Sequence, residues 1–268
     1  MSRKSSDPRN VVKNGFKSIK IITFIGVSFL LLTQVAVAGE LKTVDKVPTA
    51  YNVSKLSYLV DRQIPAGYVK ANYKAIYAPY TQSRAPSPKD LSLQEAAEIA
   101  AQEIFKFSDV TLDNQTLQMS YSPQAGQSSS TWWAQVDITP FYSFSVEVDG
   151  GTGELIRSKC TGGPNIDNEF VIDSPSADKL ISERLDAGTK QFTLDGSYAK
   201  VENLITKKGY ITEPIKSITY QWISADAFAV ISHTFDVTTS SNKLYRVALS
   251  QDLTQLRDYY RVLSTENK

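Results

Sequence analysis

The chain has 268 residues, which is room for about two domains at roughly 100–200 residues each. Apolar residues make up 41% of it, enough to bury a core, which excludes a wholly disordered protein. Residues 1–38 carry six basic groups and one acidic group, whereas the other 230 residues carry 23 basic and 27 acidic groups. Such a mildly acidic body lacks the basic footprint of a nucleic-acid-binding protein. With one histidine, His233, and one cysteine, Cys160, the composition excludes a Cys/His zinc site and an intramolecular disulfide.

The N-terminus has the three parts of a secretory signal peptide. A basic stretch precedes the apolar run Ile21–Leu32, and Ala36-Val37-Ala38 follows as a cleavage site of small residues. We therefore expect cleavage after Ala38. The alternative is an uncleaved anchor, because residues 21–39 nearly reach the ~20 residues that span a bilayer. In either case the positive-inside rule places the acidic body outside the cytoplasm.

The composition of residues 39–88 predicts a polar N-terminal segment that ends in a proline-rich linker. Within it, we expect a short helix over 52–64. A stronger helix signal follows. Ser92 and Glu95 have the spacing of a capping box, and apolar residues then recur at helical intervals. The sequence predicts an amphipathic helix from 92 to about 107.

Strand patterns come after this helix. Apolar and polar residues alternate over 117–121, 131–138 and 142–148, and the glycine-rich turn 149–153 leads into a return strand. The expected buried faces of the second and third strands are Trp132, Ala134, Val136 and Ile138, and Tyr142, Phe144, Val146 and Val148. One helix is expected to cover one face of this antiparallel meander.

The pattern then repeats. Segments match in apolar alternation at offsets of 99, 99 and 101 residues: 119–121 with 218–220, 135–138 with 234–237, and 142–148 with 243–249. The second helix is expected over 197–208. We interpret the match as an internal duplication, the alternative being a coincidence between two generic meanders.

The predicted fold class is therefore α+β, with two tandem units that each pack an amphipathic helix on an antiparallel β-meander. The predicted divisions are a signal peptide (1–38), an N-terminal segment and linker (39–88), a first unit (89–163), a connecting segment with a helix from Ser174 to Gly188 (164–189), and a second unit (190–263).

The first unit resembles the PepSY domain family. Its alanine-rich helix is followed by a hairpin whose end, Val148-Asp149-Gly150-Gly151-Thr152-Gly153-Glu154-Leu155, fits the family's typical Val-Asp-x-x-Thr-Gly-Glu-hydrophobic ending. The second unit departs from it, with Ser250 to Gln255 at this turn, as a degenerate copy. The resemblance implies a cystatin-like fold in an exported bacterial protein. It also implies a non-catalytic role, in which the domain inhibits or assists a peptidase or binds another partner.

No enzyme signature is found. His233 shares a strand face with Phe235 and Val237, which indicates a partly buried residue of the core or of the sheet surface. Cys160 has no activating base near it in sequence, so we expect a partly buried small hydrophobic residue rather than a nucleophile. Asp137 and Asp236 occupy equivalent repeat positions, which we interpret as distant solvent-facing sites rather than an acid/base pair. The sequence therefore predicts no catalytic, cofactor-binding or metal-binding residues, and a protein that is not an enzyme.

The candidate partner-binding residues are Trp133, Phe141 and Tyr259. Trp133 and Phe141 fall on the nominally polar faces of their strands, and Tyr259-Tyr260 places one ring on each face. An exposed tryptophan is typical of a partner anchor or a sugar-stacking platform, although a loop or the other unit could equally cover it.

The leading hypothesis is a secreted or cell-envelope protein that binds another protein, such as a peptidase or an envelope component. The alternative is a cell-wall or polysaccharide-binding module that uses exposed aromatic residues. No nucleic acid is expected as a partner, and membrane contact is expected only through residues 21–39 if the signal peptide is retained.

Overall fold

The computed structural model describes residues 63–79, 85–123, 130–164, 166 and 175–262. All of them belong to one compact unit, Tyr51–Lys268, which is distinct from Met1–Ala50. The predicted signal peptide lies outside the described residues, as does all but the end of the helix predicted over 52–64. Among the described helices, none is long and apolar enough to cross a membrane.

The described chain is α+β. In order, its elements are β1 (Lys74–Tyr77), α3 (Leu93–Ser108), β2 (Thr116–Ser122), β3 (Thr131–Thr139), β4 (Tyr142–Asp149), β5 (Leu155–Gly162), α4 (Pro175–Gln191), α5 (Ser197–Lys207), β6 (Ile215–Ala225), β7 (Ile231–Thr239), β8 (Leu244–Ser250) and β9 (Leu256–Val262). The strands from β2 to β5 form a first meander, and those from β6 to β9 form a second meander.

The two meanders are one sheet, in the order β1-β2-β3-β4-β5-β9-β8-β7-β6. The two separate sheets expected from the sequence are joined because β5 pairs with β9, with Ser158 opposite Tyr259 at the centre of the pairing. Every neighbouring pair is antiparallel except β1 and β2. The sheet is therefore mixed, and the last strand of each meander lies in its interior.

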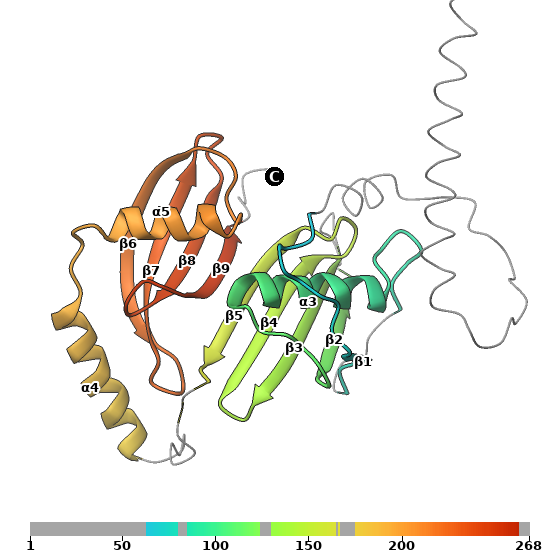
Figure 1. The fold of residues 1–268 in the computed structure, drawn as a ribbon, viewed down its shortest axis with the longest axis horizontal. Helices are drawn as coiled ribbons and strands as arrows, with labels where there is room; N and C mark the ends of the chain where they lie inside the picture. Colours follow the sequence, from blue (N-terminus) through green and yellow to red (C-terminus); the bar gives the residue numbers. More distant parts are fainter. Residues whose placement is uncertain (1–62, 80–84, 124–129, 165, 167–174, 263–268) are drawn as a thin grey trace, which may run out of the picture. The chain divides into compact units, whose positions relative to one another are not determined.

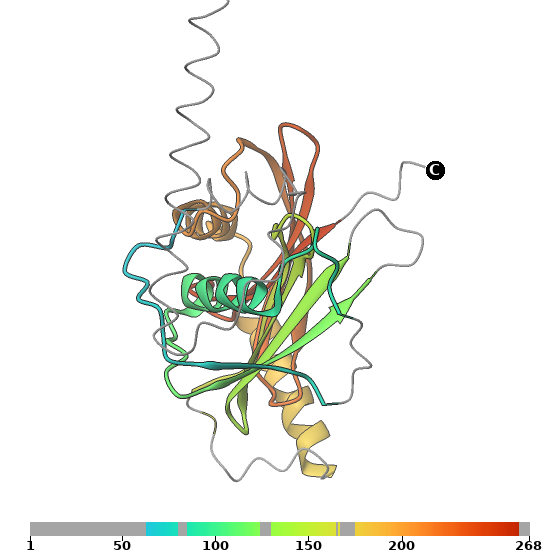
Figure 2. The same cartoon turned by 90° about the vertical axis from the view of Figure 1, so that its right-hand side faces the viewer.

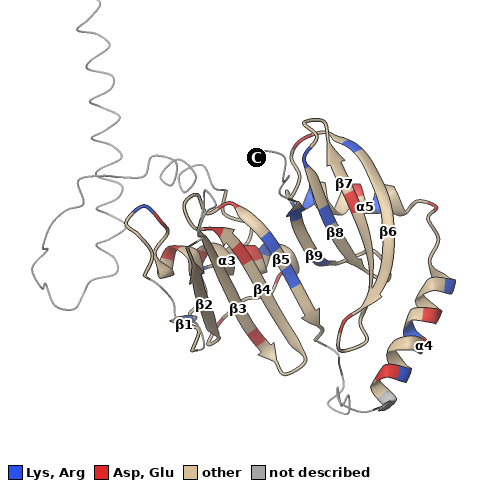
Figure 3. Cartoon of the chain, turned by 180° about the vertical axis from the view of Figure 1, so that it is seen from behind, with Lys and Arg blue, Asp and Glu red and all other residues tan. Residues whose placement is uncertain are grey.

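The helices lie on one side of this sheet (Figures 1 and 2). Helix α3 packs on the first meander, mainly on β4, whereas α5 packs on β6 and α4 on β6 and β7. On the opposite side of the strands, the described residues place no helix (Figure 3). We call this side the helix-free face.

Helix α3 begins as its sequence predicts. The Ser92 hydroxyl accepts a hydrogen bond from the Glu95 N–H (3.3 Å), and the Glu95 carboxylate accepts one from the Ser92 N–H (2.7 Å). The helix ends at Asp109, whose left-handed backbone (φ 60°) lets its N–H bond to the Phe105 carbonyl. Its buried side includes Ala96, Ala100, Ile104 and Phe107.

Helix α4 differs from its prediction, because it continues past Gly188 to Gln191. A Cβ at Gly188 would lie 3.0 Å from Ile223 Cδ1 and 3.2 Å from Ile231 Cγ2. The missing side chain thus allows the helix to approach β6 and β7, and the glycine is a packing residue rather than a stop. Helix α5 ends at Lys207, one residue before the predicted end.

The predicted strand alternation is confirmed. Trp132, Val136, Phe144, Val146 and Val148 are at most 1% exposed, on the same side of the sheet as α3. The second meander buries Phe235, Val237, Val247 and Leu249 in the same way, together with Val201 and Ile205 of α5. The residues between them in sequence therefore make up the helix-free face.

Candidate functional site

Cross-strand pairing arranges the helix-free face, which Figure 3 shows from behind, in two transverse rows of residues. The first row, from β2 to β6, is Ser120, Trp133, Glu147, Arg157, Tyr260, Arg246, Asp236 and Thr219. The second is Gln118, Gln135, Ser145, Lys159, Asp258, Ala248, Thr234 and Trp222. Charged residues gather over β4, β5, β8 and β9 in the middle of the face.

Arg157 connects the two meanders across the middle of this face. Its Nε donates to Asp258 Oδ1 (3.0 Å) and its terminal nitrogen donates to Oδ2, a bidentate pair between β5 and β9. The guanidinium also lies 5.8 Å from the centre of the Tyr260 ring. The hydrogen bonds to Asp258 raise the pKa of Arg157, so this arginine stays charged.

Arg246 makes a similar arrangement toward the β6 edge. It donates to both carboxylate oxygens of Asp236, at 2.8 and 3.2 Å. Its guanidinium lies 4.9 Å from the centre of the Trp222 ring, and Trp222 is 43% exposed. The cation–π contact and the bidentate pairing together hold the arginine in one orientation.

Trp133 lies toward the other edge and is 48% exposed. It is directly opposite Glu147 in the β3–β4 pairing, and both contribute to a cavity of about 210 Å3. Partial burial raises the pKa of Glu147, and the positive charge of nearby Arg157 opposes this shift. The same cavity is lined by Gln135, Ser143, Ser145, Arg157, Lys159 and Thr161.

A second cavity, of about 410 Å3, opens where β5 and β9 diverge beyond their three paired residues. Arg257 fills the gap, donating to the Gly162 carbonyl (2.5 Å) and to Asp226 (3.2 Å). Asp226 also accepts the Gly162 N–H (2.7 Å). These contacts bind the end of the first meander to the β6–β7 turn.

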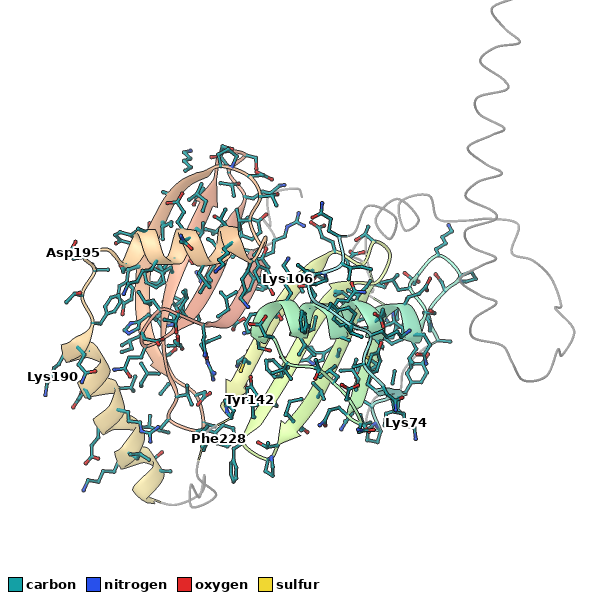
Figure 4. All side chains as sticks on the ribbon, viewed as in Figure 1. Lys74, Lys106, Tyr142, Lys190, Asp195 and Phe228 are labelled. Atoms are coloured by element: carbon teal, nitrogen blue, oxygen red, sulfur yellow. The ribbon has the colours of Figure 1, made fainter. Side chains whose placement is uncertain are left out.

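Of the three predicted partner-binding residues, only Trp133 lies exposed on the helix-free face. Phe141 is in the turn between β3 and β4 rather than in a strand. The centre of its ring lies 5.7 Å from that of Phe228, which is labelled in Figure 4. Tyr259 is 4% exposed beside Tyr210 and Tyr245, so the expectation that its ring is accessible is wrong.

Sequence reasoning missed Trp222 as a residue of this face. It shares sequence parity with Tyr220, which faces the helices, but a β-bulge between Tyr220 and Trp222 moves the tryptophan to the opposite side. Because the alternation places Tyr259 and Tyr260 on opposite faces, Tyr260 could have been chosen from the sequence in place of Tyr259. Arg157 and Arg246 left no signal, because their partners come from other strands.

His233 and Cys160 lie in the interior. The His233 ring is fully buried, stacks on Phe192 (centroids 3.9 Å apart), and has its Nδ1 3.4 Å from the Tyr220 hydroxyl. Burial lowers the pKa of His233, and burial raises the pKa of the Cys160 thiol to about 11. Of the two positions expected for His233, the core is the one observed, and the expected burial of Cys160 is confirmed.

Asp137 and Asp236 are far apart, as predicted. The first lies on β3 and the second on β7, five strand spacings away across the sheet, or roughly 24 Å. Asp236 is paired with Arg246. In the described ranges, no three His, Cys, Asp or Glu residues are grouped so that they could hold a metal ion.

The glycine-rich turn between β4 and β5 is closed from within. The Asp149 carboxylate accepts hydrogen bonds from the N–H groups of Gly151 and Thr152 and from the Thr152 hydroxyl. The Thr152 hydroxyl oxygen in turn accepts the Glu154 N–H. These side chains bond to the turn's own backbone, so the motif shapes a hairpin.

Comparison with known proteins gives little beyond this. No family model matches the chain, and no curated protein matches it. Among solved structures, it is similar to the Bacillus megaterium YpeB C-terminal domain, with a TM-score of 0.36 and 8% identity over 67% of this chain and 69% of that one. This similarity is too low to transfer a function.

Proposed function

We propose that the chain is an exported, non-catalytic binding protein whose helix-free face docks another protein. The observation that carries the proposal is the composition of that face, which combines Trp133, Trp222 and Tyr260 with two arginines that lie over aromatic rings. Tryptophan, tyrosine and arginine are the residue types that dominate the energetics of protein interfaces. A peptidase or a cell-envelope component is the kind of partner that the resemblance to PepSY domains favours.

We further propose that the two meanders are tandem PepSY-like, cystatin-like units. Support comes from strands that recur at the offsets of the sequence repeat, with α3 and α5 on the same side of the sheet. The turns also correspond. The Asp149 N–H bonds to the Glu154 carbonyl in one, and the Ser250 N–H bonds to the Gln255 carbonyl in the other.

A polysaccharide is the second candidate ligand. The cavity beside Trp133 carries the hydroxyls of Ser143, Ser145 and Thr161, and an indole beside hydroxyls suits a sugar ring. The protein hypothesis is preferred because the middle of the face is occupied by fixed Arg–Asp pairs. Such charges give orientation and partner selection at a protein interface.

Export is proposed from the N-terminal sequence. The basic stretch, the apolar run Ile21–Leu32 and the site ending at Ala38 predict removal of residues 1–38. Intact-mass measurement of the protein recovered from outside the cytoplasm tests this. A mass that retains residues 1–38 would instead indicate an anchor.

The binding proposal is tested by capture of a partner from a cross-linked envelope fraction. We expect Trp133→Ala and Trp222→Ala each to weaken capture at least tenfold, because truncating a central interface anchor typically costs about 2 kcal/mol or more. Thermal unfolding should change little, since both rings are exposed. Tyr198→Ala is the matched control, because Tyr198 is 39% exposed on α5, on the other side of the sheet. Capture unaffected by both tryptophan variants would disprove the docking face.

A further inference from the structure

The helix-free face carries three pairs of an aromatic ring and a carboxylate among its described residues, and two of them enclose an arginine. Arg157 lies between Tyr260 and Asp258, and Arg246 lies between Trp222 and Asp236. The third pair is Trp133 and Glu147. Within the described ranges, no cation lies over the Trp133 ring and none forms an ion pair with Glu147. Arg157 is directly opposite Glu147 on β5, but its guanidinium is hydrogen-bonded to Asp258, so this pair has no arginine between its ring and its carboxylate.

The geometry of the third pair suits a cation from outside. Trp133 and Glu147 are directly opposite each other on β3 and β4, so their Cβ atoms are roughly 5 Å apart on the same side of the sheet. The adjoining cavity holds about 210 Å3. Small-molecule sites usually measure about 300–1,000 Å3, so this volume suits one long side chain of a docked polypeptide.

We propose that this pocket takes an arginine side chain of the docked protein, with its guanidinium stacked on Trp133 and paired with Glu147. The inference rests on the proposed function and names the chemistry that the docking face selects. Arginine fits better than lysine because a planar guanidinium can stack on an indole and bond both oxygens of a carboxylate at once. In the other two pairs of a ring and a carboxylate on this face, the cation is also an arginine, Arg157 or Arg246.

The neighbouring charges limit the pocket to one basic residue. Arg157 also lines it, but its charge is balanced by Asp258. Lys159, two residues further along β5, also lines the pocket and has no ion-pair partner among the described residues. A second cation would be repelled there, whereas a carboxylate next to the arginine in the partner would be attracted.

The direct test uses the full chain, labelled with nitrogen-15 in its tryptophan residues, and the peptide acetyl-Ala-Arg-Ala-amide. We expect saturable movement of the Trp133 indole N–H signal, assigned with Trp133→Phe, while the signal of buried Trp132 stays in place. The same peptide with citrulline for arginine keeps the shape and removes the charge. It should bind at least tenfold more weakly, and equal binding of the two peptides would overturn the proposal.

Two variants separate the carboxylate from the general charge of the face. Glu147→Gln should lower the affinity for the arginine peptide at least fivefold. The variant should then bind the arginine and citrulline peptides equally well. Asp137→Asn is the matched control, because Asp137 is an exposed carboxylate on the same face of β3. The Asp137→Asn variant should bind the arginine peptide with the same affinity as the unmodified chain. An unchanged affinity in Glu147→Gln would also overturn the proposal.

The two proposals fail in different ways. If Trp133→Ala and Trp222→Ala weaken partner capture while both peptides bind equally, the docking face is upheld and the arginine pocket is overturned. If capture is unaffected and the peptides bind equally, both are overturned. If an N-acetylglucosamine hexamer shifts the Trp133 and Trp222 signals and the arginine peptide shifts neither, the face binds saccharide, and the arginine pocket is likewise overturned.

Discussion

Gly162, the last residue of β5, lies where no other residue fits. Its φ is +72°, and an added Cβ would lie 1.7 Å from the Phe141 carbonyl oxygen. We expect Gly162→Ala to lower the free energy of unfolding by roughly 3 kcal/mol, because strain and a backbone clash add together. Urea denaturation measures this. Gly163→Ala is the control, since its Cβ would meet no atom within 4 Å. Equal losses in both variants would contradict the explanation.

His233 should make stability depend on pH. Burial holds its pKa below the ordinary value of 6.5, so as the pH falls the unfolded chain takes up the proton first. The free energy of unfolding should therefore decrease below pH 6.5, by at most about 1.4 kcal/mol for each pH unit. We expect His233→Phe, which keeps a ring against Phe192, to remove this part of the loss. Denaturation curves at pH 7.5 and 5.5 decide it, and an identical loss in the variant would rule out the histidine as the cause.

At the scale of an element, α3 depends on its capping box. Ser92→Ala removes the acceptor for the Glu95 N–H and should destabilise the protein by about 1 kcal/mol. Gln94→Ala, an exposed change in the same turn, should have an effect within about 0.5 kcal/mol. Thermal unfolding of the two variants tests the assignment, which would fail if Gln94→Ala cost as much as Ser92→Ala.

The β8–β9 turn shows how an element survives a change of sequence. Where the first meander uses Asp149, the second uses the Ser250 hydroxyl, which accepts the N–H groups of Thr254 and Gln255. Leu253 takes a left-handed backbone with φ 60° and is 7% exposed. Burial of the leucine side chain offsets the strain that glycine avoids at Gly153 in the first turn. The second meander therefore lacks the Asp149–Glu154 turn sequence of the first, yet β8 and β9 still form the corresponding hairpin.

At the scale of the whole molecule, Arg257 joins the two meanders where β5 and β9 diverge. The Arg257 and Asp226 side chains are 9% and 17% exposed, so Arg257→Met would leave Asp226 with an unbalanced charge in a nearly dry site. Losing one partner of a buried pair costs about 3–5 kcal/mol, and the lower figure applies here because backbone N–H groups still bond Asp226.

We expect this loss to fall on the contact between the meanders, so that Arg257→Met unfolds in two steps and the original chain in one. Hydrogen exchange should show faster exchange in β5 and β9 than in β3 and β7. Arg184→Met is the control, because the hydrogen bond that Arg184 donates among the described residues goes to the Ala229 carbonyl, within the second half of the chain. A single transition in Arg257→Met at a lower denaturant concentration would mean that the remaining contacts, such as the β5–β9 pairing and the Arg157–Asp258 pair, are enough to couple the meanders.

The sequence by itself determined most of the elements and their buried sides, although not the strand β1 or the outward side of Trp222. The capping box at Ser92, the alternation around Phe144 and the apolar face of His233 all depend on neighbours within a few residues, so local pattern is enough to read them. The same reasoning placed Trp133 on the outer side of β3. It failed at Gly188, because a glycine within a helix reads as a stop unless the opposing strand is known.

Only the tertiary structure decided which surface these elements make. The pairing of β5 with β9 joins strands about one hundred residues apart and brings Arg157 to Asp258. Packing against Tyr210 and Tyr245 buries Tyr259, which the sequence had left as a candidate for the exposed face. The bulge in β6 turns Trp222 outward, against its parity in the sequence. The β5–β9 pairing and this bulge both depend on hydrogen bonds to a partner strand, distant in sequence for β5 and next along the chain for β6, and the alternation within one strand does not record them.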